Sequence, residues 1–154
     1  MIEEITNFLA LSDQLLCSGM PTAGQIGELA SAGVRRVINL ATYDPQHDPV
    51  DEAGLVSSLG LKYDSIPVDW DAPSRPDLEA FMRAMDENGQ DRVLVHCRAN
   101  YRATAFIMLY RVRRLGWTPE EAFPDVRRIW NPEEYPVWHR FITEQLAAGR
   151  DSCT

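Results

Sequence analysis

The sequence predicts a single three-layer α/β/α domain with a mostly parallel central sheet, spanning residues 1–154. Apolar runs of strand length alternate with segments of helical spacing along the chain, a pattern typical of parallel sheets covered by helices on both faces. The chain shows no internal repeat, low-complexity tract or linker, so nothing in it indicates a second domain. A length of 154 residues is enough for one domain with its own hydrophobic core.

Short apolar runs, several of them rich in β-branched residues, predict the strands. They are Leu15–Pro21 with its turn, Val34–Leu40, Lys62–Val68 and Val93–Val95. In open parallel sheets, ligands bind outside the carboxyl ends of the strands. The loops after Leu40, Val68 and Val95 are therefore expected to converge on one site.

Apolar residues at helical spacing, together with capping residues, predict the helices between and after these strands. Thr22 is placed to cap the first of them, with Ile26 and Leu29 facing inward. The predicted helices are Ala23–Ala32, Val50–Leu59, Asp77–Asn88, Tyr101–Arg114, Pro119–Ile129 and Glu134–Ala148.

Composition excludes several classes of protein. The net charge of −8 argues against nucleic-acid or anionic-membrane partners, and no apolar stretch is long enough to span a membrane. The acidic start of the chain lacks the features of a signal peptide, so we expect a cytoplasmic protein. Cys17, Cys97 and Cys153 are odd in number and far apart, which argues against a disulfide framework and a zinc site.

The stretch Arg92–Thr104 carries the most chemistry. Val93–Val95 reads as a buried strand, and Cys97 follows it in a turn that opens a helix. Free backbone N–H groups and the helix dipole stabilise an anion at such a place, and the nearby Arg98 and Arg102 add positive charge. The same field favours a thiolate, so the segment predicts an anion pocket with a nucleophilic Cys97 at its base.

This stretch resembles the His-Cys-x-x-Gly-x-x-Arg-Ser/Thr signature of cysteine-dependent protein tyrosine and dual-specificity phosphatases. The chain is most similar to small bacterial phosphatase-like proteins related to the phosphatase-like domain of beta-lactamase-hydrolase-like proteins, over about Leu15–Phe141. The resemblance implies hydrolysis of phosphate monoesters, on phosphoproteins or small molecules, through a Cys97 thiophosphate intermediate and without a cofactor or metal. The implied phosphate-binding loop is His96, Cys97, Arg98, Ala99, Asn100, Tyr101, Arg102, Ala103 and Thr104.

The loop departs from the signature at two positions. Asn100 stands where the family has Gly, and Asn tolerates a left-handed backbone better than other non-Gly residues. Ala103 occupies the family's Arg position, with Arg102 one residue earlier. Arg102 is expected either to bind two phosphate oxygens with its planar guanidinium group or to point to solvent.

The resemblance also implies a general acid for the leaving oxygen, an aspartate four residues before a proline in the preceding loop. Asp69 matches, because Pro73 follows at that spacing, and Asp71 is the alternative. Thr104 either donates its hydroxyl to the Cys97 sulfur or bonds to the backbone of the first helical turn. His96 is expected to orient the loop or to hydrogen-bond near the cysteine, rather than to transfer protons.

Two other functions remain open. Four residues separate Cys97 from Arg102, the spacing of rhodanese-like sulfurtransferases, whose cysteine carries a persulfide. The rhodanese Asp-x-Arg and Gly-His-Ile-x-Gly-Ala segments are absent, however, and the flanking sequence resembles the phosphatases. A pseudophosphatase that only binds phosphorylated ligands is the third interpretation.

Overall fold

The computed structural model describes residues 1–149, and the predicted end of the domain, with Cys153, lies outside them. Within residues 1–149 the sheet has five strands in the order β1-β2-β5-β3-β4. Their bounds are β1 Leu9–Ala10, β2 Leu15–Ser18, β3 Arg36–Asn39, β4 Lys62–Ser65 and β5 Val93–His96. The pairs of β2, β5, β3 and β4 are parallel and only β1 is antiparallel, which confirms the predicted fold class.

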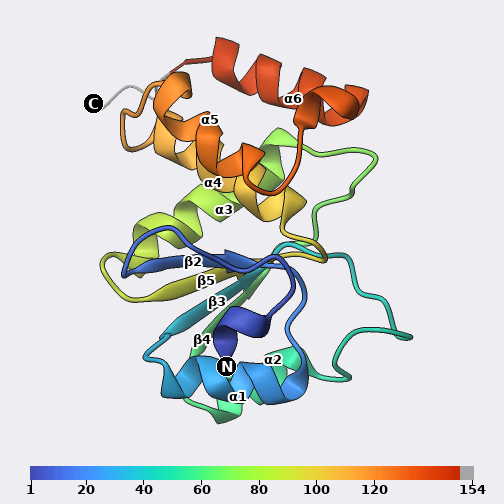
Figure 1. Cartoon of the computed structure of the whole chain (residues 1–154), viewed down its shortest axis with the longest axis vertical. Coiled ribbons are helices and arrows are strands. Elements are labelled where there is room, and N and C mark those ends of the chain that lie inside the picture. The colour runs from blue at the N-terminus through green and yellow to red at the C-terminus, as the bar shows by residue number, and fades with distance from the viewer. Residues whose placement is uncertain (150–154) are drawn as a thin grey trace.

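Helices cover both faces of this sheet. They are α1 Ala23–Ser31, α2 Glu52–Ser58, α3 Arg75–Asn88, α4 Tyr101–Arg113, α5 Pro119–Arg127 and α6 Pro136–Ala147, with short 3-10 helices η1 Ile2–Glu4 and η2 Pro132–Glu134. Figure 1 shows α1 and α2 on one face and α3 and α4 on the other, with α5 and α6 lying beyond α4. No helix among the described residues is both long and apolar enough to cross a membrane.

Strand side chains divide the core into two clusters, one on each face of the sheet. Leu16 and Leu94 pack with residues of α1 and α2, whereas Cys17, Val93 and Val95 pack with residues of α3 to α6. Because strand side chains alternate, Cys97 continues the second set and faces α4. The nucleophile predicted from the sequence thus lies at the carboxyl end of the central strand, beside helix α4, which is buried along almost its whole length.

Three of the observed helix or strand boundaries that differ from the predicted ones lie close to a proline. Helix α3 begins at Arg75 rather than Asp77, because the Ser74 hydroxyl accepts from the Asp77 N–H and Pro76 fits the first turn. Strand β4 ends at Ser65 rather than Val68, although the Ile66 and Val68 N–H groups on either side of Pro67 still donate to the Asn39 and Leu40 carbonyls. Helix α6 begins at Pro136, two residues later than predicted.

Helix α4 is buried on all sides, although its sequence predicted one apolar face. Every residue from Arg102 to Arg113 is buried, because α3 and the sheet lie on one side and α5 and α6 cover the other (Figure 1). Its arginines are accommodated by pairing: the Arg111 Nη1 lies 2.7 Å from Asp125 of α5.

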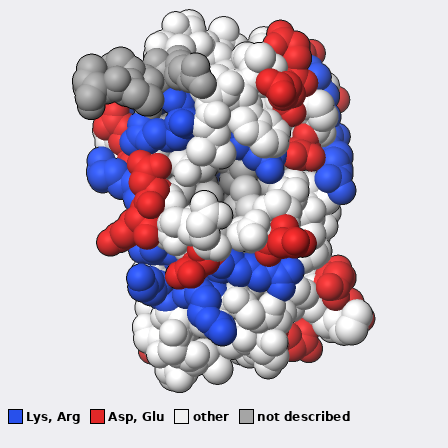
Figure 2. Space-filling model, turned by 90° about the vertical axis from the view of Figure 1, so that its left-hand side faces the viewer, with Lys and Arg blue, Asp and Glu red and all other residues white. Residues whose placement is uncertain are grey.

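The opposite end of the sheet, at the amino ends of the strands, carries charges of both signs. Figure 2 shows Lys and Arg interleaved with Asp and Glu over this face. The pairs are specific: Arg36 bonds to Asp64 and to Glu87. Ion pairs therefore stabilise this end of the sheet, which is opposite the carboxyl ends of the strands, where the site is expected.

Phe106 of α4 should be a main determinant of stability. Its ring centroid lies 5.7 Å from that of Phe81 and 6.1 Å from that of Trp138, with no exposed surface. Removing it leaves a cavity between α3, α4 and α6, so Phe106→Ala is expected to lower the free energy of unfolding by about 3–5 kcal/mol in urea titrations. Val50→Ala, at a side chain in solvent, is the control and should change it by less than about 0.5 kcal/mol. A loss below about 1 kcal/mol for Phe106→Ala would contradict this packing.

Candidate active site

Cys97 lies at the base of a cavity of about 420 Å³. The central strand β5 ends at His96, and α4 begins at Tyr101, so Cys97 stands in the short turn between them. The thiol is nearly inaccessible, with 1% of the residue exposed. The cavity is lined by Thr42, Trp70, Cys97, Arg98, Ala99, Tyr101, Arg102 and Tyr135.

Three carbonyl groups of this turn accept hydrogen bonds. The Arg98 carbonyl accepts from the Met20 N–H at 3.0 Å, and the Ala99 carbonyl accepts from the Asn7 side-chain amide at 3.0 Å. The Asn100 carbonyl accepts from the Thr104 N–H at 3.1 Å, within the first turn of α4.

These carbonyl bonds orient the N–H groups of the turn. The C=O and the following N–H point in opposite directions across a trans peptide, and the described chain has no cis bond. Together with the antiparallel bridge between Gly19 and Ala99, these hydrogen bonds fix the peptide planes of the turn against the segment after β2. Free N–H groups at a helix N-terminus favour an anion, and the anion pocket inferred from the sequence stays a prediction.

Asn100 has the left-handed backbone that the family's Gly would provide. Its φ is 72°, which confirms that this position needs a residue tolerant of positive φ. Its side-chain amide donates to the Asn7 carbonyl at 2.8 Å and to the Cys17 sulfur at 3.4 Å. Asn7 and Asn100 thus bond to each other's segment in both directions and fix the turn against the N-terminal segment.

Arg102 is held over the cavity rather than in solvent. It is 6% exposed, lines the cavity with Cys97, and donates from Nη1 to the Val68 carbonyl at 2.8 Å. Ala103, at the family's Arg position, is fully buried in the core. The turn shortened by one residue therefore brings Arg102, not residue 103, to the pocket.

Arg98 has a different role, because its side chain is paired with Asp48. Its two terminal nitrogens lie 2.9 and 3.0 Å from the two oxygens of Asp48, whose side chain is 4% exposed. A third bond reaches the Thr42 carbonyl at 3.1 Å. Arg98 thereby ties the loop after β3 to the signature loop, His96–Thr104, and the Asp48 hydrogen bond raises the pKa of Arg98.

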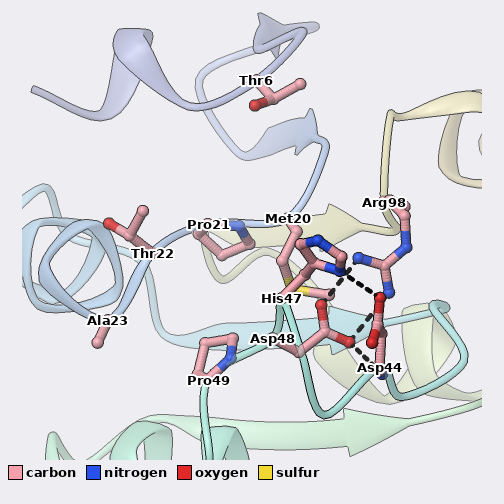
Figure 3. Close-up of a pocket in the computed structure, with 10 residues that line it drawn as sticks. All are labelled: Thr6, Met20, Pro21, Thr22, Ala23, Asp44, His47, Asp48, Pro49 and Arg98. Atoms are coloured by element: carbon pink, nitrogen blue, oxygen red, sulfur yellow. Dashed lines mark hydrogen bonds and ion pairs between the residues drawn. The ribbon is translucent and has the colours of Figure 1, made fainter.

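On the far side of Arg98 lies a second, larger cleft of about 660 Å³ (Figure 3). Asp44 and His47 face each other there, with 2.6 Å between Oδ2 and Nδ1. The hydrogen bond from His47 lowers the pKa of Asp44. Because Arg98 lines both the cleft and the Cys97 cavity, the two spaces adjoin at this one side chain.

The two candidate general acids lie in the loop between β4 and α3. Both Asp69 and Asp71 are exposed, and neither is among the residues that line the cavity. The Asp69 Oδ1 accepts from the Asp71 N–H at 2.9 Å, the turn chemistry of an aspartate in a loop. The two residues beside Asp69 do contact the site. The Val68 carbonyl accepts a hydrogen bond from Arg102, and Trp70 lines the cavity.

The cavity is bordered by an aromatic wall that the sequence did not predict. It consists of Trp70, Tyr101 and Tyr135 in the lining, with Trp130 and Trp138 packed behind them. Trp70 stacks on Trp138 at 5.4 Å, and the Trp138 Nε1 donates to the Trp70 carbonyl at 2.8 Å. Tyr101 stacks on Trp130 at 4.8 Å with 9° between their planes, while Tyr135 packs edge-on against Trp70. The only local signal in the sequence was that Trp70 follows Asp69.

Thr104 bonds to the backbone, the second of its two predicted interactions. Its Oγ1 lies 2.8 Å from the Asn100 carbonyl and accepts from the Trp130 Nε1 at 3.0 Å. Thr104 therefore links the turn to the aromatic wall.

The second described cysteine, Cys17, remains a thiol, because burial raises the pKa of Cys17 to about 12.

His96 is fully buried beside the nucleophile. Its Nδ1 lies 3.2 Å from the Cys97 carbonyl, which agrees with the predicted orienting role. Its Nε2 lies 2.8 Å from the Oε2 of Glu52 in α2, a contact that no local pattern in the sequence predicted.

Solved structures of other proteins have the same fold. A DUF442 protein from Shewanella putrefaciens CN-32 is 39% identical, with a TM-score of 0.84 over 96% of this chain and 94% of that one. TpbA of P. aeruginosa has the same fold at 19% identity, with a TM-score of 0.72 over 92% of this chain and 90% of that one.

Sequence comparison extends the likeness to larger proteins. Beta-lactamase hydrolase-like proteins of Xylella fastidiosa are 32% identical over 103 residues, or 65% of this chain. The chain spans 23% of the length of these curated relatives.

A family model described as polymorphic toxin system, DSP-PTPase phosphatase, matches residues 13–114. The match contains β2, the loop after β3, both candidate acids and the whole signature loop. The chain therefore belongs to this DSP-PTPase phosphatase family.

Proposed function

We propose that this protein hydrolyses phosphate monoesters, of phosphotyrosine or of small phosphorylated molecules, through a thiophosphate intermediate on Cys97. The observation that carries the proposal is that Cys97 and Arg102 share one cavity at the amino end of α4. A dianionic phosphoryl group matches the positive charge of Arg102 and of the helix N-terminus there.

In the first step, the Cys97 thiolate attacks phosphorus as the bond to the ester oxygen breaks. The N–H groups of the turn and the fork of Arg102 stabilise the charge on the equatorial oxygens. Asp69, or alternatively Asp71, gives its proton to the leaving oxygen. Water then attacks the thiophosphate, the carboxylate accepts a proton from that water, and inorganic phosphate leaves with Cys97 restored as thiolate.

The aromatic wall favours aryl substrates. Trp70, Tyr101 and Tyr135 line the cavity that holds Cys97, so the ring of an aryl phosphate would pack on apolar surface there. TpbA has been crystallised with phosphotyrosine, and phosphotyrosine is accordingly one of the substrates to test. The family match supports this function over the sulfurtransferase alternative.

The first test is turnover of p-nitrophenyl phosphate and phosphotyrosine by the wild type and by Cys97→Ser. The wild type is expected to release phosphate, and Cys97→Ser should abolish release while keeping vanadate binding, because the N–H groups and Arg102 remain. Sulfur transfer from thiosulfate without phosphate release would instead establish a sulfurtransferase. Vanadate binding without either activity would establish a phosphate-binding pseudophosphatase.

Arg102→Lys tests the shifted arginine. Lysine keeps the charge but loses the planar fork, so turnover should fall on the order of 100-fold. Arg128→Lys, an exposed pair with Asp125, is the matched control and should have wild-type turnover. Turnover of Arg102→Lys within twofold of the wild type would show that Arg102 does not bind the transferring group.

Asp69→Asn and Asp71→Asn separate the two candidate acids. The general-acid variant should lose turnover by about 10²–10⁴-fold and lose the alkaline limb of its pH–rate profile. The loss should be larger for phenyl phosphate than for p-nitrophenyl phosphate, because the nitrophenolate leaves readily without a proton. We expect this pattern for Asp69→Asn, and the same pattern in Asp71→Asn alone would reverse the assignment.

A further inference from the structure

The buried contact between Glu52 and His96 is not explained by packing alone. Glu52 is in the first turn of α2, on the face of the sheet opposite α4, yet only 7% of it is exposed. Its carboxylate lies 2.8 Å from the Nε2 of His96, which is itself fully buried. A carboxylate in such a place is stable only when it is paired and hydrogen-bonded.

The partners of His96 decide where its protons are. The Cys97 carbonyl at 3.2 Å from Nδ1 can only accept, so Nδ1 carries a hydrogen. Glu52 at Nε2 either accepts from an N–H as a carboxylate or donates as a neutral acid. The state of Glu52 therefore decides the charge of His96.

The other neighbours of Glu52 favour its carboxylate form. The Ala41 N–H bonds to the Asn39 Oδ1 at 2.9 Å, which leaves the Asn39 amide to donate to the Tyr63 hydroxyl at 3.0 Å. Tyr63 keeps its proton, because burial raises the pKa of Tyr63 to about 12, and its hydroxyl is placed for a hydrogen bond to Glu52. Glu52 is therefore placed to accept from two donors, the phenol and the imidazole.

We infer that Glu52 is a positioning residue that holds His96 as a doubly protonated imidazolium directly behind Cys97. The positive ring donates to the Cys97 backbone and places a charge beside the thiolate that the proposed function requires. The strand residues paired with His96 are Ser18 and Asn39, both uncharged; Glu52 is the ionisable group bonded to its ring, and Cys97 is its neighbour in the chain. The inference rests on the proposed function only where it says what the charge is for. The charge of His96 itself can be measured without turnover.

The first measurement is the protonation state of the His96 ring by ¹⁵N NMR near pH 7.5. The chain has three histidines, so its ring signals are few and can be assigned with His96→Asn. Both nitrogens of His96 should carry hydrogen in the wild type, and Glu52→Gln should leave a neutral ring protonated on Nδ1. A neutral His96 in the wild type would overturn the inference, whether or not the variant folds.

The second measurement is the pH dependence of Cys97 alkylation by iodoacetamide, followed by mass spectrometry. Removing the charge on the ring should make the thiolate less favourable, so Glu52→Gln should react about tenfold more slowly near pH 6. Glu120→Gln removes the same charge from an exposed position and should react like the wild type. An unchanged profile in a folded Glu52→Gln would assign Glu52 a purely structural role and overturn the inference.

A double-mutant cycle shows whether Glu52 acts through His96. In the His96→Asn background, Glu52→Gln should change Cys97 reactivity no further, because the ring that carries the charge is gone. A full additional tenfold effect there would refute the route through His96. If the wild type has the imidazolium and the reactive thiolate but releases no phosphate, the proposed function fails and this inference stands.

Discussion

The structure depends on hydrogen bonds that hold the carbonyl groups of one short turn away from its cavity. Met20 of the segment after β2 and Asn7 of the N-terminal segment supply the donors for Arg98 and Ala99. Without them the peptide planes of the turn could rotate and present oxygen atoms to the cavity, which would repel an anion. The edge of the fold formed by the N-terminal segment, β1 and β2 therefore helps to fix a loop that lies far along the chain, with a sequence separation of 92 between Asn7 and Ala99.

The site also joins the two faces of the sheet. On the α4 face, Arg102, Thr104 and the aromatic wall surround Cys97 and fix the first turn of the helix. On the α2 face, the Glu52 carboxylate contacts the His96 ring at the end of β5. The loop after β3 closes the side through the pair of Arg98 and Asp48. Each of these supports uses an interaction whose partner is distant in sequence.

Local sequence predicted the parts of this arrangement that are set by local chemistry. The fold class, the central strand, the turn with Cys97 and the left-handed Asn100 followed from apolar periodicity and residue type. The two-residue β1 was missed because so short a strand has no periodicity. The side of α4 that lies against α5 and α6 was also missed, because its burial depends on helices that come later in the chain.

The missing parts of the site share one cause. Asn7, Glu52 and Tyr135 act through tertiary contacts and stand in segments whose local patterns are ordinary for caps, loops and helix ends. A glutamate in the first turn of a helix, for example, is as expected for the helix dipole as for a partner of a buried histidine. Arg102 was a candidate from the sequence, but the sequence left open whether its side chain faces the pocket or solvent. The structure shows that it is buried.

The central claim is that Cys97 becomes covalently phosphorylated beneath this turn. The most direct test is to mix the wild type with excess p-nitrophenyl phosphate, quench in acid within milliseconds to seconds, and locate any added phosphoryl group by peptide mass spectrometry and ³¹P NMR. The account predicts a thiophosphate on the peptide that contains Cys97 and none on the peptide that contains Cys17. A phosphoryl group on another residue, or steady release of phosphate with Cys97 never modified, would contradict it.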